Sequence, residues 1–532
     1  MSVSPAEVLG VSIVAGKDVI GSAGSVRART AATGEDVEPT FGLLDLDQLD
    51  AAVAAAADAF ATYRETSPGR RAAFLEAIAE EIEADRDQIV GRAVLESGLP
   101  EARLSGEVGR TTGQLRMFAD VAAQGDHLGV RIDPALPDRT PAPRPDLRQR
   151  MIPLGPVAVF GASNFPLAFS TAGGDTASAL AGGCPVVVKG HPAHPGTGEL
   201  VARAVARAAA RTRMPAGVFS FVLGAGNEFG RALVSDPRIR AVGFTGSRAG
   251  GQAIVEVAQR RREPIPVYAE MSSINPVVVL PGALDGDVDG LASAYVGSLT
   301  LGAGQFCTNP GLVFVPTGDT GDRFVTAAGR LVGEAIGQLM LTPEIAEAYA
   351  RGVADLAATD DVRRVADGLA GDGPGRPAPV LNEVAASDVG RVEREVFGAS
   401  SVVVRYDGVD QLASALAAIE GQLTATVQYA PSDVEEARRL LPVLEDRVGR
   451  ILFNGWPTGV EVCHAMVHGG PYPATSDART TSVGSLAIER FQRPVCYQDV
   501  PDELLPQAVR DDNPWALSRR IDGTLSLGER DR

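Results

Sequence analysis

Short apolar runs rich in β-branched residues alternate with longer segments between residues 154 and 280, and this alternation constrains the fold more than any other feature. Each longer segment has the length of one helix. Such alternation is typical of βαβ units, in which helices connect parallel strands. Ligands bind at the carboxyl ends of the strands in open sheets of this kind. The five apolar runs are residues 157–160, 186–189, 218–223, 241–244 and 277–280.

The pattern changes on either side of this segment. Residues 46–98 have the apolar periodicity of helices, and another helix is expected at 101–123. Residues 128–145 are rich in Pro and Asp without periodicity, which predicts an irregular arm or hairpin. A second α/β region begins near residue 283, with helices expected at 324–338 and 343–359, strands at 312–315 and 401–404, and an extended segment at 486–498.

The composition limits the classes of function. A formal charge of −18 argues against a nucleic-acid or anionic-membrane partner, because both require basic patches. Four cysteines in 532 residues cannot form a disulfide framework, which favours a reducing cytoplasm. We find no basic segment followed by an apolar core at the N-terminus, so no signal peptide is expected. Pro and Gly interrupt the uncharged stretches 151–174 and 290–318, which argues against membrane spans.

Lysine is almost absent from the chain. Only Lys17 and Lys189 are lysines, whereas the other basic residues are arginines. A single lysine is ordinarily a solvated surface charge. Lys189, however, ends the apolar run 186–189, at the strand edge where ligands bind. Its rarity therefore favours a specific role as a compact positive charge.

Two glycine motifs could bind a phosphate group. Residues 224–230, which contain Gly226, read GxGxxxG and are one residue too long for a dinucleotide fingerprint. The run 241–244 leads through Gly246 and Ser247 into an expected helix, whose N-terminus would present free N–H groups to a pyrophosphate. Both motifs can equally be strand-to-helix turns, with Ser247 as the N-cap of its helix.

Three residues carry groups suited to covalent acyl chemistry. Cys307 lies among small and amide residues that permit a tight bend with exposed backbone donors, as a thiolate nucleophile requires. Glu270 ends an apolar segment and is either a buried acceptor or a desolvated base. Asn164 precedes Phe165-Pro166 and is either a turn residue or an oxyanion donor. Taken singly, each has a structural explanation.

The histidines and cysteines do not predict a metal site. His464 and His468 follow Cys463, but Gly469-Gly470 and Pro471 oppose a long regular helix at this position. His191 and His194 form another close pair. Neither pair is completed by a Cys or His at the usual zinc spacing, so we expect no metal.

Taken in order along the chain, these residues closely resemble the aldehyde dehydrogenase superfamily. Within it, residues 161–166, 270–276 and 304–310 look like the 2-oxoglutarate semialdehyde (2,5-dioxovalerate) dehydrogenase branch, which also includes NADP-dependent fatty aldehyde dehydrogenases. The resemblance covers residue 47 to the last residues. The motifs that carry it are Asn164, Lys189, Gly246-Ser247, Glu270, Cys307 and Glu395-Val396-Phe397-Gly398.

The resemblance implies a role for each matching residue. Cys307 attacks the aldehyde carbon, and the Asn164 side chain with the Cys307 backbone N–H holds the oxyanion. After hydride transfer, Glu270 activates the water that hydrolyses the thioester. The cofactor-binding residues implied are Lys189 and Glu395 for the two riboses, Phe397 near the nicotinamide ribose, Ser247 with Gly246 for the pyrophosphate, and Gly226.

Three departures from the superfamily pattern bear on the cofactor and the base. Ser272-Ser273 replaces the usual Gly-Gly after the base, so the local backbone must differ. Ser163 replaces the aromatic residue before the oxyanion Asn. Pro192 replaces the acid common in NAD enzymes, and an acid there would repel a 2′-phosphate. We therefore expect NADP as cofactor, with NAD as the alternative and His191 as a phosphate neighbour.

The resemblance also suggests a substrate. The best guess is 2,5-dioxopentanoate, oxidised to 2-oxoglutarate, and the alternative is a fatty or other medium- or long-chain aldehyde. A CoA-acylating enzyme or a non-catalytic homologue is a further alternative. An oxo-acid needs a cationic pocket, for which Arg110 and Arg116 are candidates, although arginine fills nearly every basic position in this chain. Phe165, Phe306 and Thr308 are the other candidate substrate residues.

The expected fold is α/β, with a doubly wound Rossmann-type cofactor domain, an α/β catalytic domain and a β oligomerisation arm. The arm and extended tail resemble oligomerisation strands, so a homodimer or a dimer of dimers is expected. The predicted boundaries are 1–127 and 155–281 for the cofactor domain, 282–485 for the catalytic domain, 128–154 and 486–500 for the arm, and 501–532 for a C-terminal tail.

Overall fold

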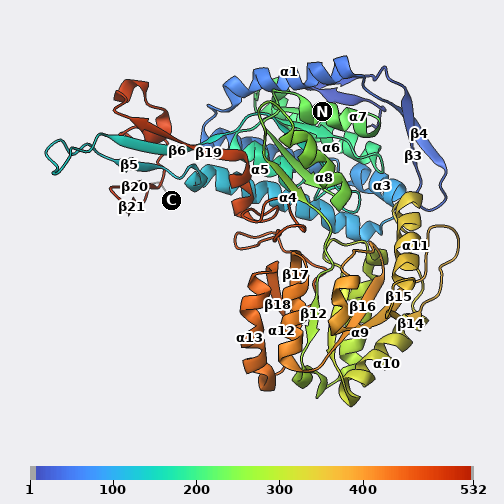
Figure 1. The fold of residues 1–532 in the computed structure, drawn as a ribbon. Coiled ribbons are helices and arrows are strands. Elements are labelled where there is room, and N and C mark those ends of the chain that lie inside the picture. The colour runs from blue at the N-terminus through green and yellow to red at the C-terminus, as the bar shows by residue number, and fades with distance from the viewer. Residues whose placement is uncertain (1–6, 529–532) are drawn as a thin grey trace.

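The computed structural model describes residues 7–528 as two α/β domains with a projecting β arm (Figure 1). The first domain is built on a sheet of order β11-β10-β7-β8-β9-β1-β2, counted within the described residues. Its strands β7 to β11 are parallel, and β1 and β2 add an antiparallel edge. The bounds are β1 (Ser12–Val14), β2 (Lys17–Val19), β7 (Val157–Phe160), β8 (Val186–Lys189), β9 (Phe219–Val222), β10 (Ala241–Thr245) and β11 (Val267–Glu270).

Alternate residues of these strands enter two different cores, as the period of a strand requires. Val157 and Val159 pack in one core, and Ala158 packs in the core on the other face. The first core is covered by α2 (Pro68–Ala84), α3 (Arg86–Ser97), α4 (Glu101–Gln124), α5 (Gly174–Gly182) and α6 (Pro195–Arg211). The other is covered by α1 (Leu46–Tyr63), α7 (Gly226–Ser235) and α8 (Arg248–Gln259).

Parallel strands connected by helices were predicted, and the structure confirms four of the five. The fifth, β12 (Val277–Val279), belongs instead to the second sheet, so the predicted domain boundary at 281 is wrong. Residues 271–276 carry the chain from one domain to the other. An apolar run shows that a strand is buried on both faces, but it does not show which sheet the strand joins.

The second domain has a sheet of order β14-β15-β16-β13-β12-β17-β18 in the part of the chain that the structure describes. Its strands are parallel except β14. Helices cover both faces. The bounds are β13 (Leu312–Pro316), β14 (Arg363–Asp367), β15 (Val380–Ala385), β16 (Ser400–Tyr406), β17 (Gln422–Gln428), β18 (Val448–Phe453), α9 (Val288–Thr300), α10 (Asp319–Glu334), α11 (Pro343–Ala357), α12 (Gly408–Ala418) and α13 (Val434–Glu445).

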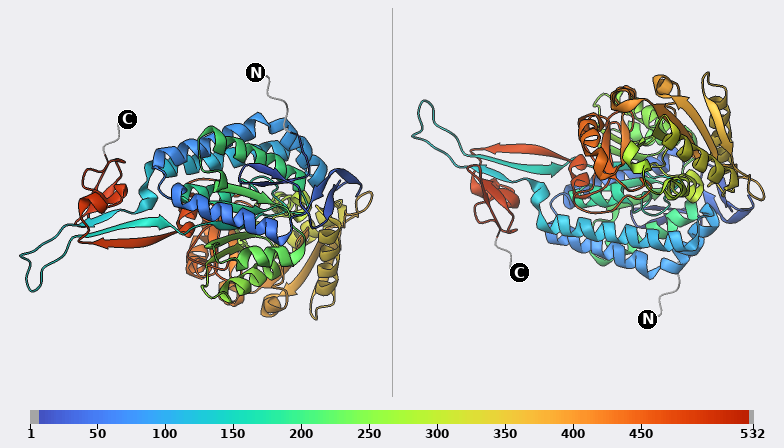
Figure 2. Two further views of the ribbon diagram at one scale, coloured as in Figure 1. Left: turned by 90° about the horizontal axis from the view of Figure 1, so that it is seen from above. Right: turned by 90° about the horizontal axis from the view of Figure 1, so that it is seen from below.

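The arm extends away from both domains as a sheet of order β19-β6-β5-β20-β21 (Figure 2). Strand β6 pairs along its length with β19, as expected for segments 128–154 and 486–498. The prediction of extended chain from 486 is wrong at its start, because η7 (Ser485–Phe491) is a 3₁₀-helix. The bounds are β5 (Arg131–Asp133), β6 (Leu147–Pro153), β19 (Gln492–Gln498), β20 (Arg519–Ile521) and β21 (Thr524–Ser526), and a separate hairpin joins β3 (Ser25–Arg29) to β4 (Asp36–Gly42).

Residues 501–528 are part of the arm, whereas the prediction gave 501–532 as a separate tail. Strand β20 pairs with β5, and Leu505, Ala508, Val509 and Leu517 share an apolar cluster with the arm residue Ile132. These buried apolar residues fix the segment to the arm despite its charged composition; residues 529–532 lie outside the described part. Among the described residues, no helix is long and apolar enough to cross a membrane.

Candidate active site

The candidate residues meet in a cleft of about 860 Å³ at the carboxyl ends of β7, β8, β10 and β11. The domain crossover at 271–276 passes through it, so residues of both domains line it. A parallel sheet places the loops after its strands at one edge, which brings together residues far apart in sequence. The predicted residues that line the cleft are Asn164, His191, Gly246, Ser247, Glu270, Cys307, Glu395 and Phe397.

A sharp bend positions Cys307. The three residues Gly302, Ala303 and Gly304 all have positive φ angles, of 56°, 60° and 70°. A side chain at Gly304 would meet the backbone carbonyl carbon of Gly398 at 2.3 Å, so only glycine permits this approach. The Cys307 carbonyl accepts a hydrogen bond from Asn275 Nδ2 at 2.8 Å. The backbone N–H of Cys307 has no acceptor within residues 7–528 and is free to bind a ligand.

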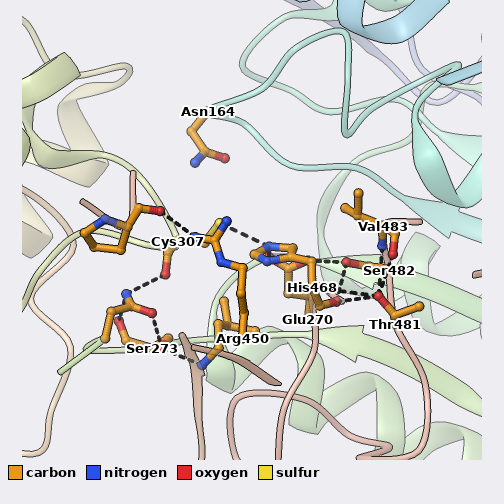
Figure 3. Close-up of polar contacts among 12 residues, drawn as sticks. Asn164, Glu270, Ser273, Cys307, Arg450, His468, Thr481, Ser482 and Val483 are labelled. Carbon is orange, nitrogen blue, oxygen red and sulfur yellow. Dashed lines mark hydrogen bonds and ion pairs between the residues drawn. The ribbon is translucent and has the colours of Figure 1, made fainter. Parts of the chain in front are cut away.

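Glu270 forms hydrogen bonds with the side chains of His468 and Ser482, which belong to the segment between β18 and η7 (Figure 3). His468 Nε2 lies 2.8 Å from Glu270 Oε1 and 3.5 Å from Cys307 Sγ. The Ser482 hydroxyl donates to Glu270 Oε2 at 2.8 Å. Both Glu270 and His468 are buried, with 4% and 1% of their surface exposed. The Cys307 thiol, the His468 imidazole and the Glu270 carboxylate therefore form one connected group.

Burial and neighbouring charges shift the pKa values of this group in opposite directions. Burial raises the pKa of the Cys307 thiol well above its usual value, and the nearby Glu270 raises it further. Burial also raises the pKa of Glu270, but hydrogen bonds and charge from His468, with Ser482 and Cys307, outweigh it and lower the pKa below its ordinary value. Glu270 is thus ionised, whereas the free thiol is protonated and needs a base before it can attack.

The side chain of Asn164 faces the loop that carries the nucleophile. Its Nδ2 donates to the Gln305 carbonyl at 3.0 Å, which leaves a second N–H on the same nitrogen. Arg103 holds the backbone at this point, because its Nη2 donates to the Asn164 carbonyl at 2.7 Å. The Arg103 guanidinium also lies 5.1 Å from the ring centre of Phe165 and 4.9 Å from that of Phe306. Arg103 therefore links Asn164 to the residue before Cys307.

Arg110 of α4 packs against the segment that follows Asn164, although it does not line the cleft. Its guanidinium lies 5.0 Å from the ring centre of Phe169 and 5.7 Å from that of Phe165. Its Nε and Nη2 atoms are buried and have no hydrogen-bond partner in the described part of the chain. Burial lowers the pKa of Arg110, whereas the charges of Cys307, Glu107, Glu461 and Glu270 raise it. These two nitrogens form the edge of a guanidinium that binds a carboxylate in bidentate fashion.

Comparison with known proteins identifies the family to which this geometry belongs. The aldehyde dehydrogenase family pattern matches residues 24–472. The chain belongs to the aldehyde dehydrogenase family. It is 54% identical to alpha-ketoglutaric semialdehyde dehydrogenase 2 of Azospirillum brasilense over 97% of this chain and 99% of the relative, and 46% identical to alpha-ketoglutaric semialdehyde dehydrogenase of Acinetobacter baylyi over the same shares.

Solved structures have the same fold. One is an NADP-dependent enzyme of E. coli, with a TM-score of 0.77 and 23% identity over 92% of this chain and 98% of that chain. Another is a Thermus 1-pyrroline-5-carboxylate dehydrogenase with bound NAD, with a TM-score of 0.78 and 22% identity over 92% of each chain. As a member of this family, the protein is an oxidoreductase that uses NAD(P).

The cleft of this aldehyde dehydrogenase fits a dinucleotide. Ser247 is the N-cap of α8 and accepts a hydrogen bond from the Gly250 N–H at 3.2 Å, so the helix N-terminus opens into the cleft. The Glu395 carboxyl also lines the cleft, and burial raises its pKa to about 7. Lys189 and Gly226 are not among the lining residues. Lys189 lies at the end of β8, next to the loop of His191, and Gly226 is exposed at the start of α7.

None of the five candidate substrate residues lines the cleft. The Arg116 guanidinium pairs with Glu76 at 2.9 Å and with Glu83 at 2.6 Å on α2, so these surface carboxylates already satisfy it. The prediction rested on the need of an oxo-acid for a cationic pocket, and the sequence does not show which arginine of the helix faces the site. Thr308 is buried, 1% exposed, and does not line the cleft. Phe165 and Phe306 do not line the cleft either, but they are next in sequence to Asn164 and Cys307 and contact each other and Arg103.

The contacts of His468, Ser482 and Arg103 at the site were not predicted from the sequence. His468 was evaluated only as a possible metal ligand. The segment that carries it has no apolar periodicity, so its position next to Cys307 could not be predicted. The ligand atoms of Glu270, Cys307 and His468 lie within 4.8 Å of one another, which is close enough for one metal ion among the described residues. Such an ion would occupy the nucleophile and the base together. The chemistry of the family instead requires both groups to be free.

Proposed function

We propose that this protein oxidises 2,5-dioxopentanoate, the semialdehyde of 2-oxoglutarate, to 2-oxoglutarate. The observation that carries the proposal is the Arg110 guanidinium, whose two unpartnered nitrogens lie in the surroundings of Cys307. An unpaired buried guanidinium is costly, and a substrate carboxylate would satisfy it. The names of the relatives that are 54% and 46% identical support the same substrate.

The first step is attack by Cys307 on the aldehyde carbon. The thiol releases its proton to solvent, and the His468 Nε2–H, which donates to Glu270 Oε1 at 2.8 Å, stabilises the thiolate sulfur 3.5 Å away. The new oxyanion receives hydrogen bonds from the free N–H of Asn164 Nδ2 and from the Cys307 backbone N–H. The nicotinamide ring of a bound NAD(P) would be the hydride acceptor. Cys307 then carries a thioester.

Hydrolysis of the thioester requires a base that is ionised near neutral pH. Glu270 meets this condition because its neighbours hold its pKa below the ordinary value. Ser482 fixes Oε2 and His468 fixes Oε1, so the carboxylate has a defined orientation toward Cys307. Glu270 takes a proton from water, and the hydroxide releases the carboxylic acid product. Retention of this base favours water over CoA as the acyl acceptor.

NADP is the cofactor that we propose, with NAD as the alternative. Burial lowers the pKa of His191 well below its usual value, so the ring is neutral, and its Nδ1 accepts the Ala193 N–H at 3.1 Å. The ring proton is then on Nε2, which can donate to a phosphate oxygen. Lys189 adds a positive charge, and Pro192 adds no negative charge. Ser247 and Gly246 would hold the pyrophosphate, and Glu395 with Phe397 would bind the nicotinamide ribose.

The assembly and the compartment are further proposals. Strands β6 and β19 form an arm that projects from the two domains, and β18 is an edge strand of the catalytic sheet. Exposed strand edges of this kind are normally covered by another chain. We propose a homodimer or a dimer of dimers in the cytoplasm. Light scattering of the purified protein measures the mass, and a monomer at micromolar concentration would contradict the assembly.

Steady-state kinetics with several aldehydes test the proposed substrate. The panel contains 2,5-dioxopentanoate, pentanal and decanal, each with NADP and with NAD, and with and without CoA. We expect the highest kcat/KM for 2,5-dioxopentanoate with NADP and a free acid as product in every case. A higher kcat/KM for decanal would support the fatty aldehyde alternative, and an acyl-CoA product would contradict hydrolysis.

A further inference from the structure

Arg450 is a second arginine that reaches the space beside Cys307. It lies on β18, and Figure 3 shows its side chain beside Cys307 and His468. Its Nη1 donates to the Gly459 carbonyl at 2.6 Å and its Nη2 to the Pro457 carbonyl at 2.8 Å. Nε lies 3.4 Å from Thr424 Oγ1 on β17. These contacts hold the guanidinium in one place, while each Nη keeps a second N–H for another acceptor.

Neither Arg450 nor Arg110 has a carboxylate within 4.0 Å in residues 7–528. This is unusual in a chain where arginines such as Arg116 and Arg148 are paired with acids. Burial lowers the pKa of Arg450, Cys307 raises it, and the positive charge of Arg110 lowers it. The two guanidiniums are thus close enough to repel each other, and both act on the nucleophile.

Two partly buried like charges without a directly paired carboxylate are unfavourable in the free protein, and the more distant charges of Glu107, Glu461 and Glu270 offset only part of this at Arg110. The backbone carbonyls at Arg450 satisfy part of its hydrogen-bonding capacity, but they supply no negative charge. An anionic ligand placed between the two guanidiniums removes the repulsion and fills the unpartnered donors of Arg110. The site therefore has the charge of a carboxylate pocket next to a reactive thiol.

We infer that Arg450 is a specificity-determining residue, which together with Arg110 selects aldehydes that carry a carboxylate close to the reacting carbon. The inference rests on the proposed function, because it assigns a second residue to recognition of the same oxo-acid. Arg110 provides the bidentate edge. Arg450 provides a second positive charge, held by residues 457–459, so that a short neutral aldehyde lacks the contact that an oxo-acid makes.

The kinetic test compares Arg450→Ala and Arg450→Lys with the unchanged enzyme on two substrates of equal chain length, 2,5-dioxopentanoate and pentanal. Arg447→Ala is the matched control, because Arg447 also donates to a backbone carbonyl, that of Ala417. We expect Arg450→Ala to lower the ratio of kcat/KM for the oxo-acid to kcat/KM for pentanal by about ten- to hundredfold, mainly through KM. In Arg450→Lys this ratio should fall less than in Arg450→Ala, and in Arg447→Ala it should equal that of the unchanged enzyme.

A second measurement does not depend on the physiological aldehyde. Alkylation of Cys307 by iodoacetate is compared with alkylation by neutral iodoacetamide, with Cys307→Ala as the blank. A cationic pocket accelerates the anionic reagent, so the ratio of the two rate constants should fall about tenfold in Arg450→Ala. If the unchanged enzyme shows no preference for the oxo-acid, the proposed function fails, while this ratio still tests Arg450.

Two outcomes would overturn the inference. One is an unchanged iodoacetate-to-iodoacetamide ratio in Arg450→Ala that retains the melting temperature of the unchanged enzyme. The other is an equal loss of kcat/KM for both aldehydes, which would show that Arg450 only supports the segment 457–459.

Discussion

The Nε2 atom of His468 lies 2.8 Å from Oε1 of Glu270, and both side chains are buried. The same nitrogen lies 3.5 Å from Cys307 Sγ. One imidazole thus connects Glu270, the proposed base for hydrolysis of the thioester, to Cys307, the proposed nucleophile. Because burial raises the pKa of Cys307, a neighbouring donor that stabilises the thiolate favours attack at neutral pH.

Replacing His468 should slow formation of the thiolate. For His468→Gln we expect kcat/KM to fall about ten- to hundredfold, the usual worth of a hydrogen bond to a buried charged group. Alkylation of Cys307 by iodoacetamide at pH 7 should slow as well, because it needs the same thiolate. His464→Gln, an exposed histidine in the same segment, is the control and should change neither rate. Equal rates of alkylation in His468→Gln and the unchanged enzyme would contradict the assigned role.

Removing the Ser482 hydroxyl should raise the pKa of Glu270. Ser482 donates to Oε2 at 2.8 Å and is one of the contacts that hold this pKa below the ordinary value. Because a base works only when ionised, the acidic limb of the kcat–pH profile should move to higher pH in Ser482→Ala. Ser485→Ala is the control, since that hydroxyl binds the His464 carbonyl instead. A shift of the limb to lower pH would refute the assignment.

Arg103 is a positioning residue for the oxyanion site. Without it, the Asn164 carbonyl loses a 2.7 Å hydrogen bond and the rings of Phe165 and Phe306 lose the cation between them. We expect kcat to fall about tenfold in Arg103→Ala, less than the 10²–10³-fold loss expected for Asn164→Ala itself. Arg86→Ala, which removes a bond to the Ser105 carbonyl, should leave kcat unchanged. A change confined to KM would argue for substrate contact instead.

An acid at position 192 should reverse the cofactor preference. Pro192 lies next to His191, which lines the cleft, and a carboxylate there would repel a 2′-phosphate. In Pro192→Glu we expect kcat/KM for NADP to fall at least tenfold, while that for NAD changes little. Pro137→Glu, on the exposed arm, adds the same charge far from the cofactor. Equal losses with both cofactors would show a structural effect rather than charge repulsion.

Zinc should inhibit the enzyme reversibly. Thiolate, imidazole and carboxylate are the ligands that Zn²⁺ prefers, and those of Cys307, His468 and Glu270 lie within 4.8 Å of one another. We expect micromolar Zn²⁺ to abolish activity, a chelator to restore it, and His468→Gln to weaken the inhibition of the remaining activity. Activation by Zn²⁺ would contradict the assignment of these groups to acid–base and covalent chemistry.

Local sequence patterns identified the strands that build the cleft but not every contact within it. Apolar runs and their turns predicted the bounds of β7, β8, β9 and β10 within one or two residues, because a strand that is buried on both faces has a continuous apolar sequence. The same pattern could not assign β12 to its sheet. Which sheet a strand joins depends on pairing with strands far along the chain.

Among the candidate catalytic residues, too, only those in local motifs could be predicted from the sequence. Glu270 and Cys307 stand in motifs with a recognisable order, whereas His468 reaches them from a segment that has no periodicity and is fixed by its bonds to Thr481 and Ser482. Arg110 and Arg116 lie on one helix and differ only in what faces them across the packed structure. The tail 501–528 has charged composition, yet four apolar residues are sufficient to join it to the arm.

Rapid mixing of the enzyme with 2,5-dioxopentanoate and NADP tests the central claim most directly. With Glu270→Gln we predict a burst of reduced cofactor close to one per active site, little further turnover, and an acyl group on Cys307 detected by mass spectrometry. Cys307→Ala should give no burst. A burst that survives in Cys307→Ala, or full steady turnover in Glu270→Gln, would contradict oxidation through a thioester on Cys307 that Glu270 hydrolyses.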